Sequence, residues 1–96
     1  MPLSIIATLS VAKGKNAEFE NVAAQLTALV NENEAKCNFY YFNKSREDAQ
    51  TYIAMEQYVD QEAFDLHCKT DYFRSLGKEL AACMSAPPKI QLLDTI

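Results

Sequence analysis

The 96-residue chain has no tryptophan and carries only two glycines, three prolines and one histidine. So few glycines and prolines leave little material for long irregular loops, and we expect most residues to lie in helices or strands. This length is typical of one domain, here residues 1–96. Hydrophobic residues form 49% of the chain and charged residues 23%, a composition that indicates a folded protein rather than a disordered one.

The chain also lacks a basic run, a long apolar run and a leader-like N-terminus. Its net charge is −4 and its densest basic stretch is Lys13-Gly14-Lys15, whereas a nucleic-acid backbone requires many more cationic contacts. No stretch approaches the roughly 18 apolar residues of a membrane span. We therefore expect no nucleic-acid partner, no membrane contact and a cytoplasmic location.

Metal and cofactor sites have little support in the sequence. The three cysteines, Cys37, Cys68 and Cys83, are an odd number without paired spacing, which is typical of reduced thiols. One histidine and unclustered cysteines do not supply the three or four ligands of a metal site. No glycine-rich loop is present for a nucleotide, flavin or nicotinamide. We expect neither a metal nor a cofactor.

Side-chain periodicity predicts four strands and three helices. Strands are expected at Leu3–Val11, Cys37–Asn43, Thr51–Tyr58 and Lys89–Ile96, and helices from Asn16 to about Glu34, after Asp60, and from Thr70 or Asp71 to Pro87-Pro88. Asn16, Asp60 and Thr70 or Asp71 are expected to cap the helices, because their side chains accept bonds from free backbone N–H groups. This β-α-β-β-α-β order, with its second helix in two pieces, is typical of an α+β, ferredoxin-like split βαβ fold with a four-stranded antiparallel sheet.

The second predicted strand is unusually aromatic, with Phe39, Tyr40, Tyr41 and Phe42 in succession. Alternation along a strand places two of them on each face of the sheet, while the helices cover only one face. We therefore expect the other face to be buried too, most simply against a second copy of the chain in a homodimer.

His67 and Glu56 are the expected catalytic residues. His67 follows Phe64 by three residues on one helix face, and an imidazole exchanges protons near neutral pH. Glu56 lies among aromatic residues near the end of the third strand, where a carboxylate could hold the imidazole or act as a base. A structural histidine bonded to backbone and a simple salt bridge at Glu56 are the alternatives. The acidic groups around Glu34 are expected to be solvated.

Aromatic and apolar residues near these two are the expected substrate-binding set. Tyr40, Tyr58 and Tyr72 could donate hydrogen bonds to a substrate oxygen and stack on its ring. Phe39, Met55 and Phe64 are expected to line apolar space. Packing in the core or at an interface is the alternative for each of them.

The ordered spacing of these residues resembles the antibiotic biosynthesis monooxygenase family, whose members are small dimeric α/β barrels. The residues that carry this resemblance are Gly14, Phe19, Glu34, Cys37, Tyr40, Glu56-Gln-Tyr58-Val-Asp60, Ala63-Phe64, His67, Phe73 and Pro88. The resemblance implies a homodimer with a pocket between sheet and helices in each subunit. It also implies a small-molecule substrate, a phenol, quinol or polyketide, oxidised by molecular oxygen without metal or flavin.

Other activities within this wider group remain open. One relative isomerises a phosphorylated, sugar-like signal compound, and a non-catalytic barrel that binds a small apolar ligand or serves in a stress response is a further alternative. Haem degradation is disfavoured, because His67 and Gly77 stand where that branch carries tryptophan and the iron-binding histidine. Tyr72 stands where many members carry a second histidine.

Overall fold

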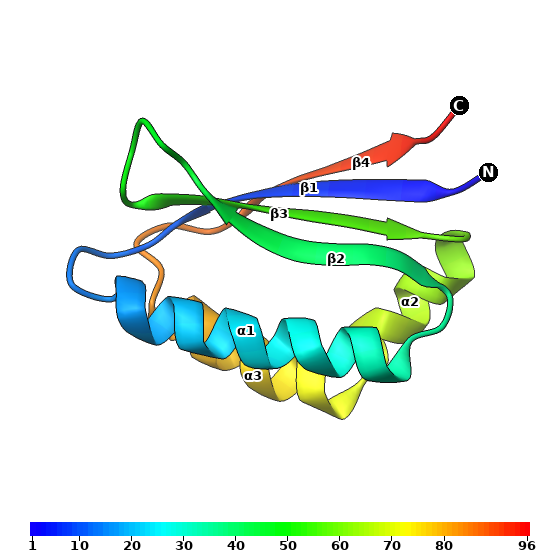
Figure 1. Ribbon diagram of the computed structural model, residues 1–96, viewed down its shortest axis with the longest axis horizontal. Coiled ribbons are helices and arrows are strands. Elements are labelled where there is room, and N and C mark those ends of the chain that lie inside the picture. Colours follow the sequence, from blue (N-terminus) through cyan, green and yellow to red (C-terminus); the bar gives the residue numbers. More distant parts are fainter.

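Four strands and three helices make up the computed structural model, which describes all 96 residues. In chain order the elements are β1 (Leu3–Ser10), α1 (Asn16–Asn33), β2 (Cys37–Lys44), β3 (Thr51–Tyr58), α2 (Gln61–Lys69), α3 (Asp71–Ala82) and β4 (Lys89–Asp94). The strands form one antiparallel sheet in the order β2-β3-β1-β4, and the helices lie against one side of it (Figure 1). The predicted α+β, ferredoxin-like fold is therefore confirmed.

The register of the central strands brings the start of the chain beside the end of β3. Leu3 pairs with Tyr58, and Ser10 pairs with Thr51. The N- and C-termini consequently lie at the same end of the sheet, which is the end where α2 packs (Figure 1). This end of the sheet carries the functional site described below.

The core forms between the sheet and α1, as the alternation in β1 predicts. Every second residue of β1, from Leu3 to Leu9, is buried on the helix side. From α1, the spacing of Phe19, Leu26 and Val30 places three side chains on one stripe, and each is fully buried. Burying one such side chain stabilises the fold by roughly 1.5–3 kcal/mol.

The helix caps agree with the prediction at two of three places. The Asp60 carboxylate accepts a bond from Ala63 N at 2.9 Å, and Thr70 caps α3. Asn16 is not a cap, because Lys15 holds that position and the Asn16 amide donates to Ala49 O at 2.8 Å instead. It thereby ties α1 to the β2–β3 connection.

Gly14 permits the turn before α1, since its φ of 86° lies in the left-handed region.

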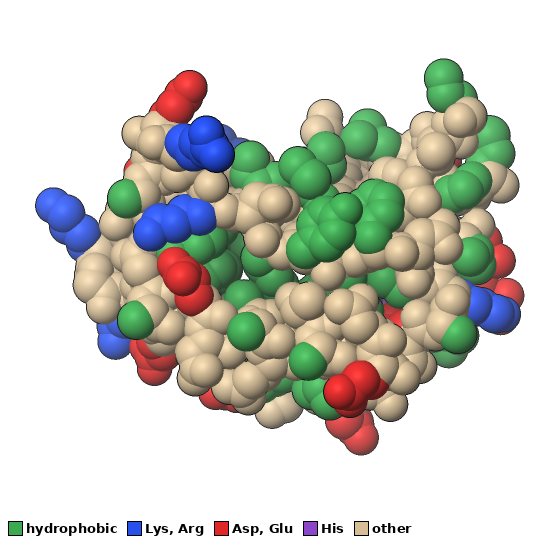
Figure 2. All heavy atoms as spheres, viewed as in Figure 1, with side chains coloured by type: hydrophobic (Ala, Val, Ile, Leu, Met, Phe, Trp, Pro, Cys, Tyr) green, Lys and Arg blue, Asp and Glu red, His purple; other side chains and the backbone are tan.

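The face of the sheet away from the helices is uncovered in the single chain. Tyr41 is 49% exposed and Met55 is 38% exposed. A single copy of the chain therefore does not bury both faces of β2. Figure 2 shows hydrophobic side chains gathered over the strands, with acidic side chains mostly over helices and loops.

The last strand is shorter than predicted and ends at Asp94. None of the helices is long and apolar enough to cross a membrane.

Candidate functional site

The chain's only histidine, His67, lies in the last turn of α2 and is 1% exposed. Aromatic rings surround its imidazole. The centroid distances are 5.4 Å to Tyr40, 5.3 Å to Tyr58, 6.4 Å to Phe64 and 4.5 Å to Phe73. These rings come from β2, β3, α2 and α3, so the site exists only once these four elements have packed together.

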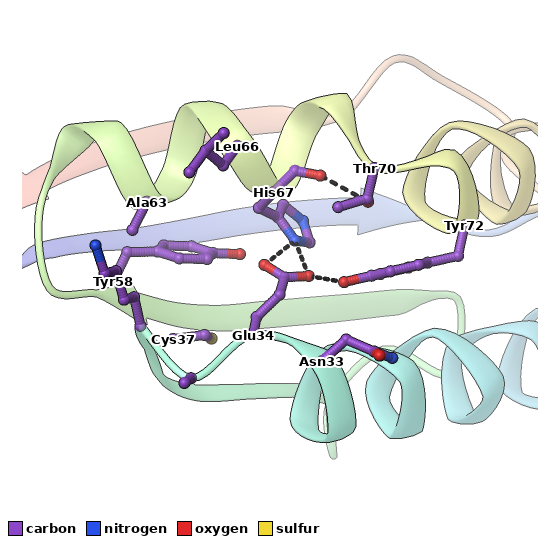
Figure 3. Close-up of a pocket in the computed structure, with 11 residues that line it drawn as sticks. Asn33, Glu34, Cys37, Tyr58, Ala63, Leu66, His67, Thr70 and Tyr72 are labelled. Atoms are coloured by element: carbon purple, nitrogen blue, oxygen red, sulfur yellow. Dashed lines mark hydrogen bonds and ion pairs between the residues drawn. The ribbon is translucent and has the colours of Figure 1, made fainter.

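A carboxylate from α1 holds one edge of this imidazole. Glu34, the C-cap residue of α1, places both of its oxygens 3.0 Å from His67 Nδ1, and the Tyr72 hydroxyl donates to the same carboxylate (Figure 3). A carboxylate only accepts hydrogen bonds, so Nδ1 carries the proton. In the neutral imidazole the lone pair is then on Nε2, which is buried and has no hydrogen-bond partner. A histidine oriented in this way is ready to accept a proton.

This pairing corrects two expectations. Glu34, rather than Glu56, is the acidic partner of His67, and the Glu34 side chain is only 13% exposed instead of solvated. A signal for this was present in the sequence. Glu34 follows Val30 by four residues, so it continues the buried stripe of α1 beyond the end of the helix. A carboxylate on an apolar stripe indicates a buried polar partner.

Glu56 is also buried, but its environment differs. It is 8% exposed, and its Oε1 accepts a hydrogen bond from the Tyr58 hydroxyl at 2.8 Å. Burial raises the pKa of Glu56 from 4.5 to about 7; the Tyr58 bond lowers it and the Glu34 charge raises it further. Near neutral pH this group can therefore either give or take a proton.

Two hollows lie near the imidazole. The outer pocket, of about 400 Å³, lies between the end of α1 and α2, and its lining includes Glu34, His67 and Tyr72 (Figure 3). The inner cavity, of about 180 Å³, lies between the sheet and α3, and its lining includes Tyr40, Glu56 and Phe73. His67 lines the outer pocket, and its ring packs against Tyr40 and Phe73, which both line the inner cavity.

The structure brings together most of the predicted substrate-binding residues, but not all of them. Tyr40, Tyr58, Tyr72 and Phe64 gather around His67. Phe39 and Met55 do not, because strand alternation places them on the opposite, uncovered face of the sheet. There Phe39 stacks on Tyr41 with 5.4 Å between ring centroids, and Tyr41 pairs with Met55. These two residues are outside both hollows.

The tyrosines around His67 stay protonated at neutral pH. Burial raises the pKa of both Tyr40 and Tyr58, with the nearby Glu56 charge adding to it. Burial, the bond to Glu34 and its charge raise the pKa of Tyr72 to about 12. They can therefore donate hydrogen bonds to an anionic oxygen. Burial and the two glutamates also raise the pKa of the Cys37 thiol, to about 11, which makes it a poor nucleophile.

No group of three His, Cys, Asp or Glu side chains lies close enough to hold a metal ion. The fold and the site thus define a ferredoxin-like domain with a buried carboxylate–imidazole pair among aromatic rings. Residues 2–78 match the model of the family described as antibiotic biosynthesis monooxygenase, and the chain belongs to this family.

Solved structures agree with this assignment. A protein from Caulobacter crescentus CB15, described as a candidate antibiotic biosynthesis monooxygenase, is 35% identical with a TM-score of 0.96, over 99% of this chain and 90% of that one. A Pseudomonas aeruginosa protein is 28% identical with a TM-score of 0.87, over 99% and 94%. A Nitrosomonas europaea protein, 17% identical with a TM-score of 0.94 over 99% and 90%, shares the fold. Among curated proteins, none matches this sequence.

Proposed function

We propose that this protein is a cofactor-independent monooxygenase that acts on a small phenolic, quinol or polyketide-like substrate. One observation carries the proposal. The His67 imidazole is buried among aromatic rings, is held at Nδ1 by Glu34, and has a free Nε2. Family membership supports the reaction class, and the aromatic surroundings support an aromatic substrate.

In the proposed reaction, His67 Nε2 accepts the proton of a substrate hydroxyl. The Glu34 carboxylate stabilises the imidazolium that forms, as an acid partner does in other carboxylate–histidine pairs. The resulting phenolate is richer in electrons than the phenol and reduces molecular oxygen directly. Tyr40 contributes by donating a hydrogen bond to the developing anion.

The electrons of this reaction balance without an added reductant. A quinol that takes up one O₂ leaves as a hydroxyquinone, with one water as the second product. Two electrons come from the oxidation of the quinol to the quinone, and two come from the conversion of a ring C–H to C–OH. One oxygen atom enters the product and the other enters the water.

Oxygen uptake with a panel of quinols and hydroxylated aromatics tests the proposal. We expect uptake with at least one of them, and a loss of about 10²–10⁴-fold in His67→Ala, the usual contribution of a general base. Unchanged turnover in a folded His67→Ala protein would remove the imidazole from the mechanism. Absence of uptake across the panel, with deuterium exchange into a keto compound, would favour the isomerase alternative. Tight binding without either reaction would favour a ligand-binding barrel.

We propose further that two copies pair through the uncovered faces of their sheets. This face carries the stacked Phe39 and Tyr41 and the exposed Met55, an apolar surface that a monomer would leave in water. Sedimentation at micromolar concentration is expected to give a dimer, and Tyr41→Glu is expected to shift it toward monomer. A wild-type monomer under these conditions would refute the pairing.

A further inference from the structure

Gly77 lies in the interior of α3, where a glycine destabilises a helix relative to alanine. Two ordinary reasons for a glycine are absent here. Its backbone does not need the left-handed region, which only Gly14 occupies in this chain. Nor does close packing require it, because a Cβ at this position would meet no heavy atom within 4 Å. The space beside Gly77 is open.

This open space belongs to the inner cavity. Small residues of the sheet, Ala7 and Ala54, face α3 across it, and Gly77 and Leu80 line the helix side. The volume is about 180 Å³. An apolar cavity of roughly 150 Å³ in another protein is known to hold one benzene molecule. The inner cavity therefore has the size of a single aromatic ring with small substituents.

Polar groups without partners lie around this cavity. The Tyr40 hydroxyl makes no intramolecular hydrogen bond, and Glu56 uses only Oε1, which Tyr58 occupies. The Tyr40 hydroxyl as a donor and the second Glu56 oxygen as an acceptor thus match a ring that carries hydroxyl groups.

The outer pocket differs in this respect. Its carboxylate is already engaged, since both Glu34 oxygens bind His67 Nδ1 and the carboxylate also accepts from the Tyr72 hydroxyl. A ligand that binds Glu34 would have to break these bonds. Tyr40 and Glu56, which line the inner cavity, each have hydrogen-bonding capacity left for a ligand.

We propose that the inner cavity seats one hydroxylated aromatic ring beside Gly77, and that Gly77 determines specificity by leaving room for this ring. This inference rests on the proposed function and narrows its substrate class to single-ring phenols and quinols. A side chain at position 77 would occupy the place of the ring. Any larger fused ring system would extend beyond the cavity toward solvent.

Binding of 4-fluorophenol, followed by ¹⁹F NMR, tests this inference without requiring turnover. We expect the wild-type protein to bind it and Gly77→Leu to bind it about tenfold more weakly or worse, because the added side chain overpacks the occupied cavity. Ser75→Leu places the same side chain at an exposed position of α3 and is expected to leave binding unchanged. Equal binding by wild type and Gly77→Leu, or no binding by wild type, would overturn the inference.

A second measurement covers the case in which Gly77→Leu does not fold. In the wild-type protein, nuclear Overhauser effects are expected from the ring protons of 4-fluorophenol to Gly77 Hα and the Leu80 methyls. Effects only to Leu66 and Thr70 of the outer pocket would refute the placement. The proposed function and the proposed ring site can be refuted separately. If the ring binds but no oxygen is taken up, only the monooxygenase function is refuted. If oxygen uptake is the same in Gly77→Leu as in wild type, only the ring site is refuted.

Discussion

The two sides of the His67 imidazole are built in opposite ways. On the Nδ1 side, Glu34 and Tyr72 form a closed set in which every polar group has a partner. On the Nε2 side, aromatic rings exclude water and leave the nitrogen without a partner. Unpartnered buried polar atoms are costly, so proteins retain few of them without a reason. We therefore propose that the Nδ1 side orients the imidazole and that Nε2 is the atom that exchanges a proton with the substrate.

The two buried glutamates repeat this contrast. The Glu34 oxygens are fully engaged with a histidine and a tyrosine. Glu56 has one hydrogen bond and lines an apolar cavity, and burial raises its pKa to about 7. The two carboxylates thus differ in how fully their oxygens are engaged. Separate substitutions of Glu34 and Glu56 test this difference.

The largest effect is expected for Glu34→Gln. An amide can present its NH₂ group to Nδ1, which allows the His67 proton to move to Nε2 and blocks the base. We expect turnover to fall by about 10²–10⁴-fold, as when the acid of a carboxylate–histidine pair is replaced by its amide. Because His67 is the only histidine, ¹⁵N NMR of the imidazole reports its tautomer directly. The Nδ1–H form is expected in wild type, and a loss of this preference in the variant.

Glu32→Gln is the matched control for this prediction. Glu32 lies two residues earlier on α1 and is exposed, so its replacement removes the same charge without touching His67. It is expected to retain both the tautomer and the turnover of wild type. If Glu34→Gln behaves like Glu32→Gln, the Nδ1 side does not orient the imidazole.

A smaller effect, on stability rather than turnover, is expected for Glu56→Gln. Burial raises the Glu56 pKa from 4.5 to about 7, so between these values the folded chain binds more protons than the unfolded chain. The stabilising contribution is fully present below pH 4.5 and is lost as pH rises through 7. This difference in the Glu56 pKa between the folded and unfolded chain corresponds to about 3 kcal/mol in the free energy of unfolding. Glu56→Gln should remove this part of the pH dependence.

Urea unfolding at pH 4, 6 and 8 measures this effect. From pH 4 to pH 8 the wild-type free energy of unfolding should fall by more than that of Glu56→Gln. Glu79→Gln, at an exposed position of α3, serves as the control and should follow wild type. Parallel pH profiles for wild type and Glu56→Gln would show that the inner cavity does not perturb this carboxyl group.

Local sequence signals predicted most of the fold. The alternation in β1 and the apolar stripe of α1 matched the buried faces, and β3 begins and ends at the predicted residues, Thr51 and Tyr58. Asp60 caps its helix as expected, because capping involves residues only three positions apart. Asn16 failed as a cap because its amide bonds to Ala49, 33 positions further along the chain.

The same distinction between local and long-range contacts applies to the site. Local helix spacing was enough to predict that the His67 ring turns inward with Phe64, and the ring is buried. The expectation that His67 and Glu56 share one cavity is not met, because His67 lines the outer pocket and Glu56 lines the inner cavity.

Local signals could not show that Glu34 holds the imidazole, because His67 is 33 residues away and the contact requires α1 and α2 to pack against the same end of the sheet. The tertiary structure also decided that Phe39 and Met55 lie outside the site. Alternation tells which residues share a face, but packing of the helices decides which face is the pocket.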